Sequence, residues 1–388
     1  MKKNKVLISY HYFPHYRLPI FKKLVNSNDY EYRFLSGQET DISIRLISQA
    51  DMLENNINWI KVKNYWFYKK KFLWQEKIIS ECVFGDYDAV IFIANPYIIS
   101  TLIAIIAAKF FKKKVLLWGH GTFRNKKRDF FKKMFYLLAD GVMLYGNWAR
   151  NNMIKLGFEP NKLFVIYNSL DYENQINKRK QLDYKKIQKE KETLFKNSEL
   201  PLLLFIGRLT FRKELNKLIS IIKKFKESGY PVNLLIVGDG ESRINLENET
   251  ATQKTKTFVH FYGETYDETT ISHLIAMADI CVSPGDVGLT AMHSMTYGTP
   301  VITHDNPYMQ MPEFEAIIPG KTGDFYQYGS QQDLYDKIKN WLEKAKDQRE
   351  EIRQNCFTII DNFYNPLSQK LAIEQALDSL FRTEPCDD

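Results

Sequence analysis

Short apolar runs alternate with helical segments along most of this chain, and the alternation occurs in two blocks. The first block contains six runs with the length and composition of buried strands, at residues 6–10, 30–35, 89–93, 114–118, 141–144 and 163–166. The second block contains five, at residues 202–206, 233–237, 259–262, 280–282 and 301–302. Strands that alternate with helices form parallel crossover units, so each block predicts a doubly wound α/β domain.

A highly charged stretch with little apolar periodicity, residues 171–198, separates the two blocks. It predicts a linker between an N-terminal domain at residues 1–170 and a C-terminal domain at 199–360. We expect residues 361–388 to contain an amphipathic helix that packs back toward the N-terminal domain. A chain of 388 residues is long enough for two such domains, at about 100–200 residues each.

Positive charge is concentrated in the first block. Residues 1–175 hold 27 Lys or Arg against 15 Asp or Glu, a net +12, whereas the remainder holds 27 against 31, a net −4. Residues 61–77 interleave lysines with six aromatic side chains, a composition suited to an anionic membrane surface. A solvated helix face backed by core aromatics is an equally good interpretation. Nucleic acid is not expected as a partner, because the chain has no zinc-finger spacing, RNP motif or basic zipper.

The chain has no run of about 18 apolar residues and no signal-peptide cleavage pattern. We therefore expect a cytoplasmic protein, which would lie at the inner face of the cell membrane if its basic block binds lipid. The four cysteines are scattered without a C-x-x-C pair, at Cys82, Cys281, Cys356 and Cys386. They predict reduced thiols rather than a disulfide framework or a zinc site.

Residues 283–302, SPGDVGLTAMHSMTYGTPVI, contain the strongest functional signal. They leave a buried strand, turn through Pro-Gly-Asp and enter a helix near Gly288, whose first residues are Leu289 and Thr290. Glycines allow the backbone to approach a ligand closely, and the N–H groups at a helix start stabilise an anion. We therefore expect phosphate binding at this stretch.

Two cations follow the first strand of the second block. Gly207 and Arg208 end that strand, and Lys213 lies at the head of the next helix. In an open parallel sheet, ligands bind at the carboxyl ends of the strands, where these residues are expected. A pair of solvated cations would explain Arg208 and Lys213 if they stood alone. Beside the glycine-rich stretch, they predict a site for a diphosphate.

These segments resemble the successive donor-domain motifs of retaining glycosyltransferases of family 4. The similar segments are FIGRLTFRKELNKLI, LLIVGDGESR, HFYGETYDETTISHLIAMADICVSP and GLTAMHSMTYGTPVI, with weaker similarity at LLWGHG, ADGVMLYGNWA and VIYNSLD. The resemblance implies the GT-B fold, two facing Rossmann-like domains with a cleft between them. It also implies sugar transfer from a nucleotide sugar without a metal or another cofactor, with Arg208 and Lys213 as the diphosphate-binding cations and Gly207 and Gly240 in the donor site.

One departure from the family pattern concerns its two glutamates, which lie eight positions apart around the phosphate loop. Their places fall on Gly285, with Asp286 beside it, and on His293. Asp286 is a candidate for contacting the donor sugar, and His293 for hydrogen bonding to the ribose. Alternatively, Glu313 or Glu315 supplies the carboxylate.

Candidate acceptor-side residues lie in the first block. His120, between two glycines after a strand, is a candidate for contacting the donor sugar or its phosphate across the cleft; a satisfied loop histidine is the alternative. The loop at residues 11–17 offers His11, His15, Tyr16 and Arg17 for acceptor binding, although core packing is an equally good interpretation for Tyr12 and Phe13. The pair Asp86 and Asp88 is an ordinary acidic turn, and no metal is expected there.

The function expected from these features is transfer of a hexose from a nucleotide-diphosphate sugar to a glycan acceptor. The basic first block favours a lipid-linked oligosaccharide acceptor, used in cell-surface polysaccharide biosynthesis. Two other functions fit the missing glutamates: a GT-B protein that binds a sugar or nucleotide without transferring it, and a nucleotide-sugar epimerase of the same fold.

Overall fold

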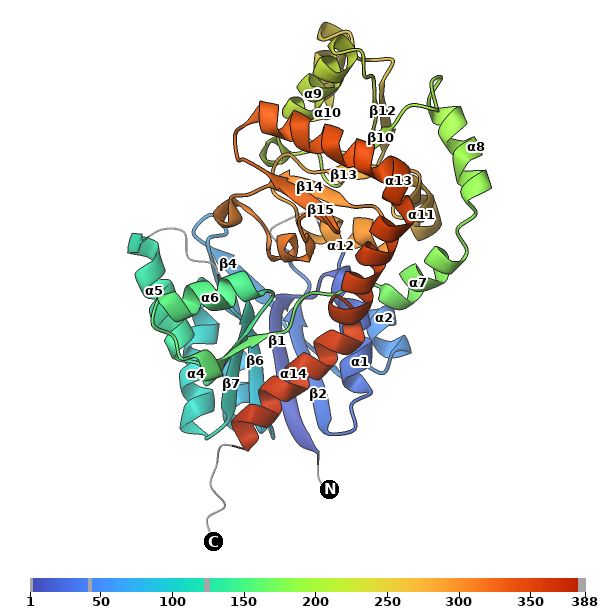
Figure 1. The fold of residues 1–388 in the computed structure, drawn as a ribbon. Coiled ribbons are helices and arrows are strands. Elements are labelled where there is room, and N and C mark those ends of the chain that lie inside the picture. The colour runs from blue at the N-terminus through green and yellow to red at the C-terminus, as the bar shows by residue number, and fades with distance from the viewer. Residues whose placement is uncertain (1–2, 41–43, 122–125, 383–388) are drawn as a thin grey trace. The chain divides into compact units, whose positions relative to one another are not determined.

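The computed structural model describes residues 3–40, 44–121 and 126–382, with backbone alone for 126–128. It divides into two compact units (Figure 1). The first unit contains the residues up to Asp171 together with the helix α14, and the second contains Tyr172–Phe363. No helix in the described part of the chain is both long enough and apolar enough to cross a bilayer.

The first unit is built on a seven-stranded sheet in which all neighbouring strands are parallel, in the order β3-β2-β1-β6-β7-β8-β9. Its strands are β1 (Asn4–Tyr12), β2 (Tyr30–Gly37), β3 (Trp59–Lys61), β6 (Ala89–Ile93), β7 (Lys114–Gly119), β8 (Gly141–Leu144) and β9 (Leu163–Val165). Its helices are α1 (Leu18–Val25), α2 (Gln49–Glu54), α3 (Ile78–Phe84), α4 (Ile99–Phe110), α5 (Lys126–Leu137), α6 (Asn147–Lys155) and α14 (Pro366–Phe381).

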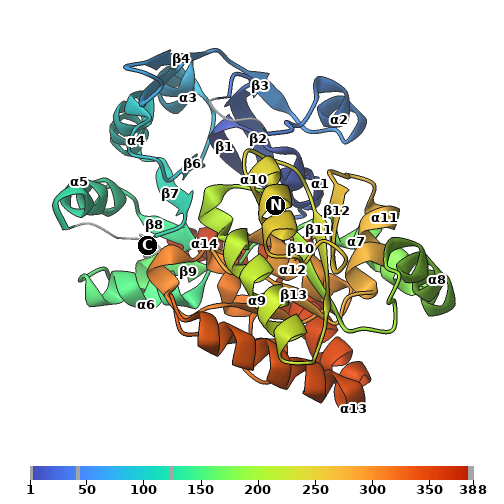
Figure 2. The same ribbon diagram turned by 90° about the horizontal axis from the view of Figure 1, so that it is seen from above.

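Helices cover both faces of this sheet, which explains why its strands are continuous apolar runs. Along β1, Val6 and Ile8 point to a core shared with α1 and α14, whereas Leu7 points to a second core shared with α3, α4 and α5. α3 and α4 pack side by side over that second core (Figure 2). α14 begins at Pro366, after Asn365 accepts a hydrogen bond from the Ser368 N–H, a common start for a helix.

Residues 38–80 contain several elements that were not assigned from the sequence. They contain α2, β3 and an antiparallel hairpin formed by β4 (Asn64–Phe67) and β5 (Phe72–Gln75), and they lead into α3. The aromatic residues of the basic segment 61–77 are therefore arranged on a two-stranded hairpin rather than on a helix. Each strand has only four residues, too few for alternation of apolar and polar residues to be informative.

The second unit has a six-stranded sheet, again parallel throughout, in the order β12-β11-β10-β13-β14-β15. Its strands are β10 (Leu202–Ile206), β11 (Asn233–Val237), β12 (Val259–Gly263), β13 (Ile280–Val282), β14 (Val301–His304) and β15 (Gly323–Tyr326). Its helices are α7 (Tyr172–Lys180), α8 (Tyr184–Leu194), α9 (Leu215–Glu227), α10 (Arg243–Thr252), α11 (Glu268–Ala276), α12 (Leu289–Thr296) and α13 (Gln331–Phe363), the last kinked at Gln348. Both sheets are thus doubly wound, as the alternation predicted.

The charged segment 171–198, interpreted from sequence as a linker, is largely helical, and from Tyr172 onward it lies in the second unit as α7 and α8. Ile187 and Phe195 are buried in that unit's core, against residues of β10 and α11. Two apolar anchors in a long polar segment were too few to reveal this packing from periodicity. Cys82, Cys281 and Cys356 are buried and form no disulfide, and Cys386 lies outside the described residues.

Candidate functional site

The strand order of the second sheet changes direction between β10 and β13, which are neighbours in the sheet but distant in the chain. Ligands of open α/β sheets bind at such a switch point, outside the carboxyl ends of the strands. The segment that contains Gly207, Arg208 and Lys213 follows β10, and the segment 283–288 follows β13. Both predicted phosphate-binding segments therefore start at the same edge of the sheet, on adjacent strands.

The two segments are in direct contact. The Gly285 N–H donates to the Lys213 carbonyl oxygen at 3.0 Å. A Cβ atom on Gly285 would lie 2.1 Å from the Arg212 carbonyl oxygen and 2.8 Å from the Lys213 Cα, so only glycine fits without backbone movement. The Thr290 hydroxyl, in the first turn of α12, donates to the Ile206 carbonyl at the end of β10, at 3.0 Å.

Asp286 forms ion pairs with two cationic side chains where these two segments meet. The Lys213 ammonium group donates to the Asp286 carbonyl oxygen at 2.7 Å and lies 3.1 Å from its carboxylate; Arg212 lies 2.7 Å from the other carboxylate oxygen. These carboxylate contacts are ion pairs without good hydrogen-bond geometry. The Asp286 side chain is only 2% exposed, against 15% for Lys213. Asp286 was one candidate for contacting the donor sugar; in the structure its carboxylate is buried against these two cations.

Arg208 lies at the exposed start of the loop after β10. Gly207 before it has φ +146°, a conformation that favours glycine, and its N–H donates to the Val237 carbonyl. Gly240 has a packing reason of its own, because a Cβ there would lie 2.5 Å from the Leu209 carbonyl oxygen. The two glycines thus shape the loop that carries Arg208.

The turn at residues 283–288 is fixed by side chains that sequence reasoning did not identify. The Thr303 hydroxyl donates to the Ser283 and Gly285 carbonyl oxygens, at 2.9 and 3.0 Å. Gln310 accepts from the Val287 N–H at 2.8 Å and donates to Thr303 at 2.9 Å. These residues lie on or just after β14, and no local sequence pattern marks such long-range hydrogen bonds.

Helix α12 starts at this turn without a side-chain cap. Its N-cap residue is Gly288, which has no side chain to cap the helix. The positive end of the helix dipole lies at Leu289 and Thr290. This end lies at the same sheet edge as Lys213.

Glu313 is a carboxylate that the structure places beside this helix start. A Cβ built on Gly288 would lie 3.8 Å from a Glu313 carboxylate oxygen, and Glu313 is 3% exposed. Glu315, two residues later on the same 3-10 helix at Pro312–Ala316, is half-buried. Of the two alternatives considered for the missing glutamate, Glu313 is thus the one beside the glycine turn.

His293, at the place of the second missing glutamate, has a carboxylate partner within the same unit. Its Nε2 lies 2.8 Å from Glu268 at the start of α11, and Tyr297 also donates to that carboxylate. Burial opposes ionisation of Glu268, but hydrogen bonds from His293, Tyr297 and Gln175 outweigh it and lower the pKa of that carboxyl. Glu268 was not singled out from sequence, because it lies 25 residues from His293.

In the first unit, His120 is exposed at the end of β7, with its ring centroid 5.1 Å from that of Tyr145. Gly121 after it has φ +59°, and a Cβ on Gly119 before it would lie 2.5 Å from the Ala94 Cβ. The local backbone conformation and packing therefore explain why glycine occupies positions 119 and 121.

The loop at residues 11–17 contains four predicted acceptor-binding residues with different exposures. His11, His15 and Tyr16 are partly exposed, whereas Arg17 is only 3% exposed. The Arg17 guanidinium donates to Tyr145 and to Asn168, and it packs over the Trp118 ring. An acceptor-binding role does not fit Arg17, because its charge is enclosed by the unit's own side chains.

Among the residues that the structure describes, no group of three or more His, Cys, Asp or Glu side chains is arranged to hold a metal ion. Asp86 pairs with Lys5 at 2.5 Å, and Asp88 accepts from the Lys5 N–H at 2.7 Å. These contacts give both acidic residues a structural partner.

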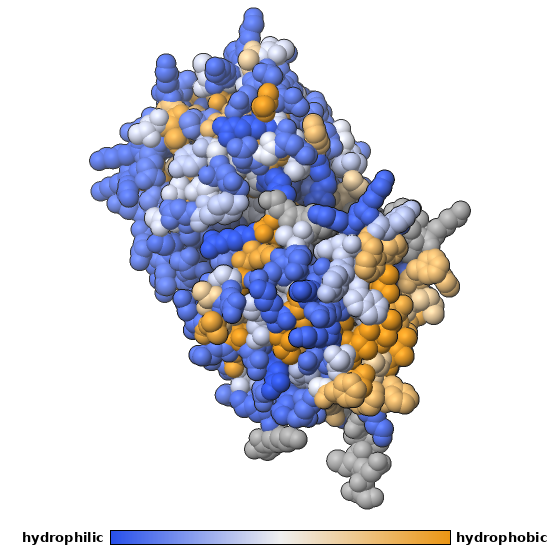
Figure 3. Space-filling model, turned by 180° about the vertical axis from the view of Figure 1, so that it is seen from behind, coloured by the Kyte–Doolittle hydropathy of each residue, from blue (hydrophilic) through white to orange (hydrophobic). Residues whose placement is uncertain are grey.

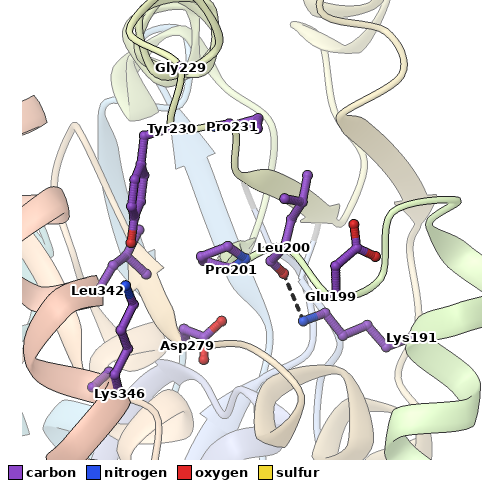
Figure 4. Close-up of a pocket in the computed structure, with 11 residues that line it drawn as sticks. Lys191, Glu199, Leu200, Pro201, Gly229, Tyr230, Pro231, Asp279, Leu342 and Lys346 are labelled. Atoms are coloured by element: carbon purple, nitrogen blue, oxygen red, sulfur yellow. Dashed lines mark hydrogen bonds between the residues drawn. The ribbon is translucent and has the colours of Figure 1, made fainter.

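A pocket of about 430 Å³ opens at the opposite, amino-terminal edge of the second sheet (Figure 4). Leu200 and Pro201 before β10, Pro231 before β11 and Asp279 before β13 line it. The Lys191 ammonium group, also in its lining, donates to the Leu200 carbonyl at 2.9 Å. Since the predicted site residues of the second unit all follow the strands, this pocket is separate from them.

A known family model matches most of the second unit. Residues 186–357 match the model described as "Glycosyl transferases group 1". A "41.2 kDa protein in cps region" from Klebsiella pneumoniae is 26% identical over 239 residues, which are 58% of this chain and 60% of that relative. This chain therefore spans less than two thirds of that relative's length.

Two solved structures share the fold across nearly the whole chain. The complex of HepE from Anabaena with UDP has a TM-score of 0.73 at 17% identity, covering 97% of this chain and 100% of HepE. The apo form of the lipopolysaccharide outer core galactosyltransferase WaaB has a TM-score of 0.68 at 16% identity, covering 97% of this chain and 99% of WaaB. The chain thus has the GT-B fold with two Rossmann-like domains and, over residues 186–357, matches the group 1 glycosyl transferases.

Proposed function

We propose that this chain is a retaining glycosyltransferase that moves a sugar from a nucleotide-diphosphate sugar to a hydroxyl group of a glycan acceptor. The observation that carries the proposal is the contact between Lys213 and Asp286, which joins the cationic segment to the glycine turn at the switch point of the second sheet. The family match covers the same residues. HepE, which shares the fold, was solved with UDP and with UDP-glucose, so uridine diphosphate sugars are the first donors to test.

In this proposal the donor diphosphate lies between Arg208, Lys213 and the start of α12. Arg208 forks onto phosphate oxygens, Lys213 supplies a fixed point charge, and the backbone at Gly207, Gly288, Leu289 and Thr290 approaches the phosphates. Gly285 and Gly240 shape this surface from behind. Asp286 orients the Lys213 ammonium group before the donor binds.

In this proposal Glu313, which is 3% exposed, supplies the carboxylate of the first missing glutamate at the glycine turn. Its position beside Gly288 supports this role over one for Glu315. His293, held by Glu268, hydrogen-bonds to the ribose through its second ring nitrogen. Glu313→Gln is expected to impair sugar transfer more than UDP binding. His293→Ala is expected to impair UDP binding more than sugar transfer.

The chemistry in this proposal needs no metal or other cofactor. Negative charge grows on the departing diphosphate as the glycosidic bond lengthens, and the fixed cations Arg208 and Lys213 stabilise it. The departing phosphate oxygen accepts the proton of the acceptor hydroxyl, which attacks from the same face and preserves the anomeric configuration.

The acceptor in this proposal is a lipid-linked oligosaccharide used for a cell-surface polysaccharide, reached from the cytoplasmic side of the membrane. His120, His11, His15 and Tyr16 are the candidate residues that meet the sugar and the acceptor, since all four are at least partly exposed. The fold shared with WaaB, a lipopolysaccharide galactosyltransferase, supports this class of acceptor.

A thermal-shift screen with UDP, GDP, dTDP and CMP sugars tests donor binding, because a ligand that binds the folded state raises Tm. One nucleotide class should raise Tm in the wild type and less in Lys213→Ala. Absence of a shift for every class at saturating concentrations would argue against the proposal.

Because residues 285 and 293 are not glutamate, two other functions need to be distinguished from sugar transfer: sugar binding without turnover, and epimerisation of the donor sugar. Incubation of the stabilising donor with lipid-linked acceptors should yield a glycosylated product with retained configuration. Binding without turnover would indicate a sugar-binding protein, and conversion of the donor sugar without acceptor would indicate an epimerase.

A further inference from the structure

Helix α4 exposes apolar side chains on the face that points away from the first sheet. Its inward face buries Ala104, Ile105 and Ala108, whereas Ile106 and Phe110 on the other side are 58% and 81% exposed. Leu102 and Ile103 extend the exposed stripe, at 39% and 41%. A surface helix ordinarily presents polar side chains to water, and one that is apolar all round ordinarily contacts a second apolar phase.

Neighbouring elements continue this apolar stripe. α5 exposes Phe130, Phe131, Met134 and Leu137, at 62%, 76%, 49% and 49%. Lys109 on α4 joins the two helices, because it donates to the carbonyl of Leu138 just after α5, at 3.1 Å. Figure 3 shows the resulting apolar area on the face over α4 and α5. Large contiguous apolar patches are rare on soluble monomers and mark interaction sites.

The basic hairpin adjoins the start of α4. Leu73 on β5 donates its N–H to the Tyr97 carbonyl at 3.1 Å and forms a β-bridge with Ile98, the residue before α4. The turn of the hairpin exposes Tyr68 and three lysines, Lys69 to Lys71. The segment whose composition suggested a membrane surface is therefore continuous with the apolar stripe.

Cationic side chains flank the stripe among the described residues. Lys112 is exposed at the end of α4, next to Phe110, and Lys132 and Lys133 on α5 are partly exposed. Lys109, also at the end of α4, pairs with Asp140 at 2.9 Å. An apolar surface flanked by cations is complementary to a bilayer with anionic headgroups, in which aromatic and aliphatic side chains enter the interface and lysines remain among the phosphates.

We propose that the docking face, defined as the outward sides of α4 and α5 with the hairpin turn at residues 68–71, binds an anionic lipid bilayer. A second copy of the chain is a poorer occupant, because pairing two such faces would bring their lysines together. Nucleic acid would leave the apolar stripe in water. The proposal does not depend on the transferase activity, and its test uses neither donor nor acceptor.

Vesicle flotation with the full chain tests the proposal, comparing phosphatidylcholine vesicles with vesicles that also contain phosphatidylglycerol. The wild type should bind the anionic vesicles and lose binding in high salt. Ile106→Ser/Phe110→Ser should weaken binding at least about tenfold, because two exposed apolar side chains no longer enter the interface. Lys70→Gln/Lys112→Gln should weaken binding to the vesicles that contain phosphatidylglycerol and should not change binding to pure phosphatidylcholine vesicles.

Leu367→Ser/Leu371→Ser is the matched control. These residues are 57% and 50% exposed on α14, which covers the other face of the same sheet, and the change should leave vesicle binding intact. Unchanged circular dichroism and Tm will show that each variant is folded. The proposal is wrong if the wild type ignores anionic vesicles or if the α4 variant binds them normally. It is also wrong if that variant changes only the oligomeric state.

Discussion

The Lys213 ammonium group lies 2.7 Å from the carbonyl oxygen of Asp286 and 3.1 Å from its carboxylate. The two residues are 73 positions apart and follow adjacent parallel strands. Their contact fixes a largely buried cation beside the start of α12 at Gly288. A charge that is oriented before a ligand arrives stabilises that ligand without further reorganisation.

Arg208→Ala should lower turnover about a hundredfold or more, because the proposed leaving diphosphate loses a forked hydrogen-bond donor. Tm should change little, since the side chain is exposed. Arg212→Ala is the matched control, with a side chain that is 65% exposed and pairs with Asp286. Steady-state kinetics with the stabilising donor should show a much smaller loss in the control. Equal losses in the two variants would remove the specific role of Arg208.

Asp286→Asn should destabilise the second unit by about 3 kcal/mol, because Lys213 is left without its buried counterion. Urea denaturation measures the change in the free energy of unfolding. Asp286→Asn/Lys213→Met should recover part of the loss, since the unpaired cation is then absent. If the two single substitutions prove additive, the ion pair contributes nothing of its own.

Gly285→Ala should destabilise the fold by at least about 2 kcal/mol, because its Cβ would lie 2.1 Å from a backbone oxygen. Gly288→Ala offers a matched comparison three residues away, where the nearest atoms to a Cβ lie at 3.6 Å. Its effect on Tm should be small. Similar Tm values for the two variants would contradict the close approach of the two segments.

Stability should fall as the pH decreases from about 6.5, partly through His304. Burial lowers the pKa of this 1% exposed histidine, although nearby Glu214 and Asp286 oppose the shift. A histidine with a lowered pKa binds fewer protons in the folded state than in the unfolded state. Its contribution is therefore complete above the unfolded pKa and is lost as the pH falls toward the folded pKa.

His304→Asn should reduce this pH dependence, measured as the free energy of unfolding at a series of pH values. The wild-type Nδ1 accepts from the Asn306 N–H at 3.2 Å, so the variant needs its own reference value at neutral pH. A pH profile identical to the wild type would show that His304 does not titrate in this range.

The strands were the most predictable part of the fold. The expected ranges 89–93, 141–144, 202–206, 233–237 and 280–282 coincide with β6, β8, β10, β11 and β13. Buried parallel strands are continuous apolar runs, so their ends are marked by the first polar or turn residue. The hairpin of β4 and β5 was not predicted, because short exposed strands have no such pattern.

The residues of the candidate site also fall into a group that the sequence predicted and a group that it did not. Gly207, Lys213, Gly285 and Gly288 were identified from local motifs, and the structure brings them to one sheet edge. Glu268, Thr303 and Gln310 were missed, because their partners lie on other elements. Arg17 was a candidate for acceptor binding but is enclosed by Tyr145, Trp118 and Asn168.

The sequence by itself determined the two doubly wound sheets and the identity of the segments at their carboxyl edges, because apolar periodicity and turn residues are local properties of the chain. Only the tertiary structure decided that Asp286 turns inward to Lys213, that Glu313 lies beside Gly288 and that α4 presents an apolar stripe to its surroundings. Those outcomes depend on which distant side chains share a small volume, and only the packed fold brings those side chains together.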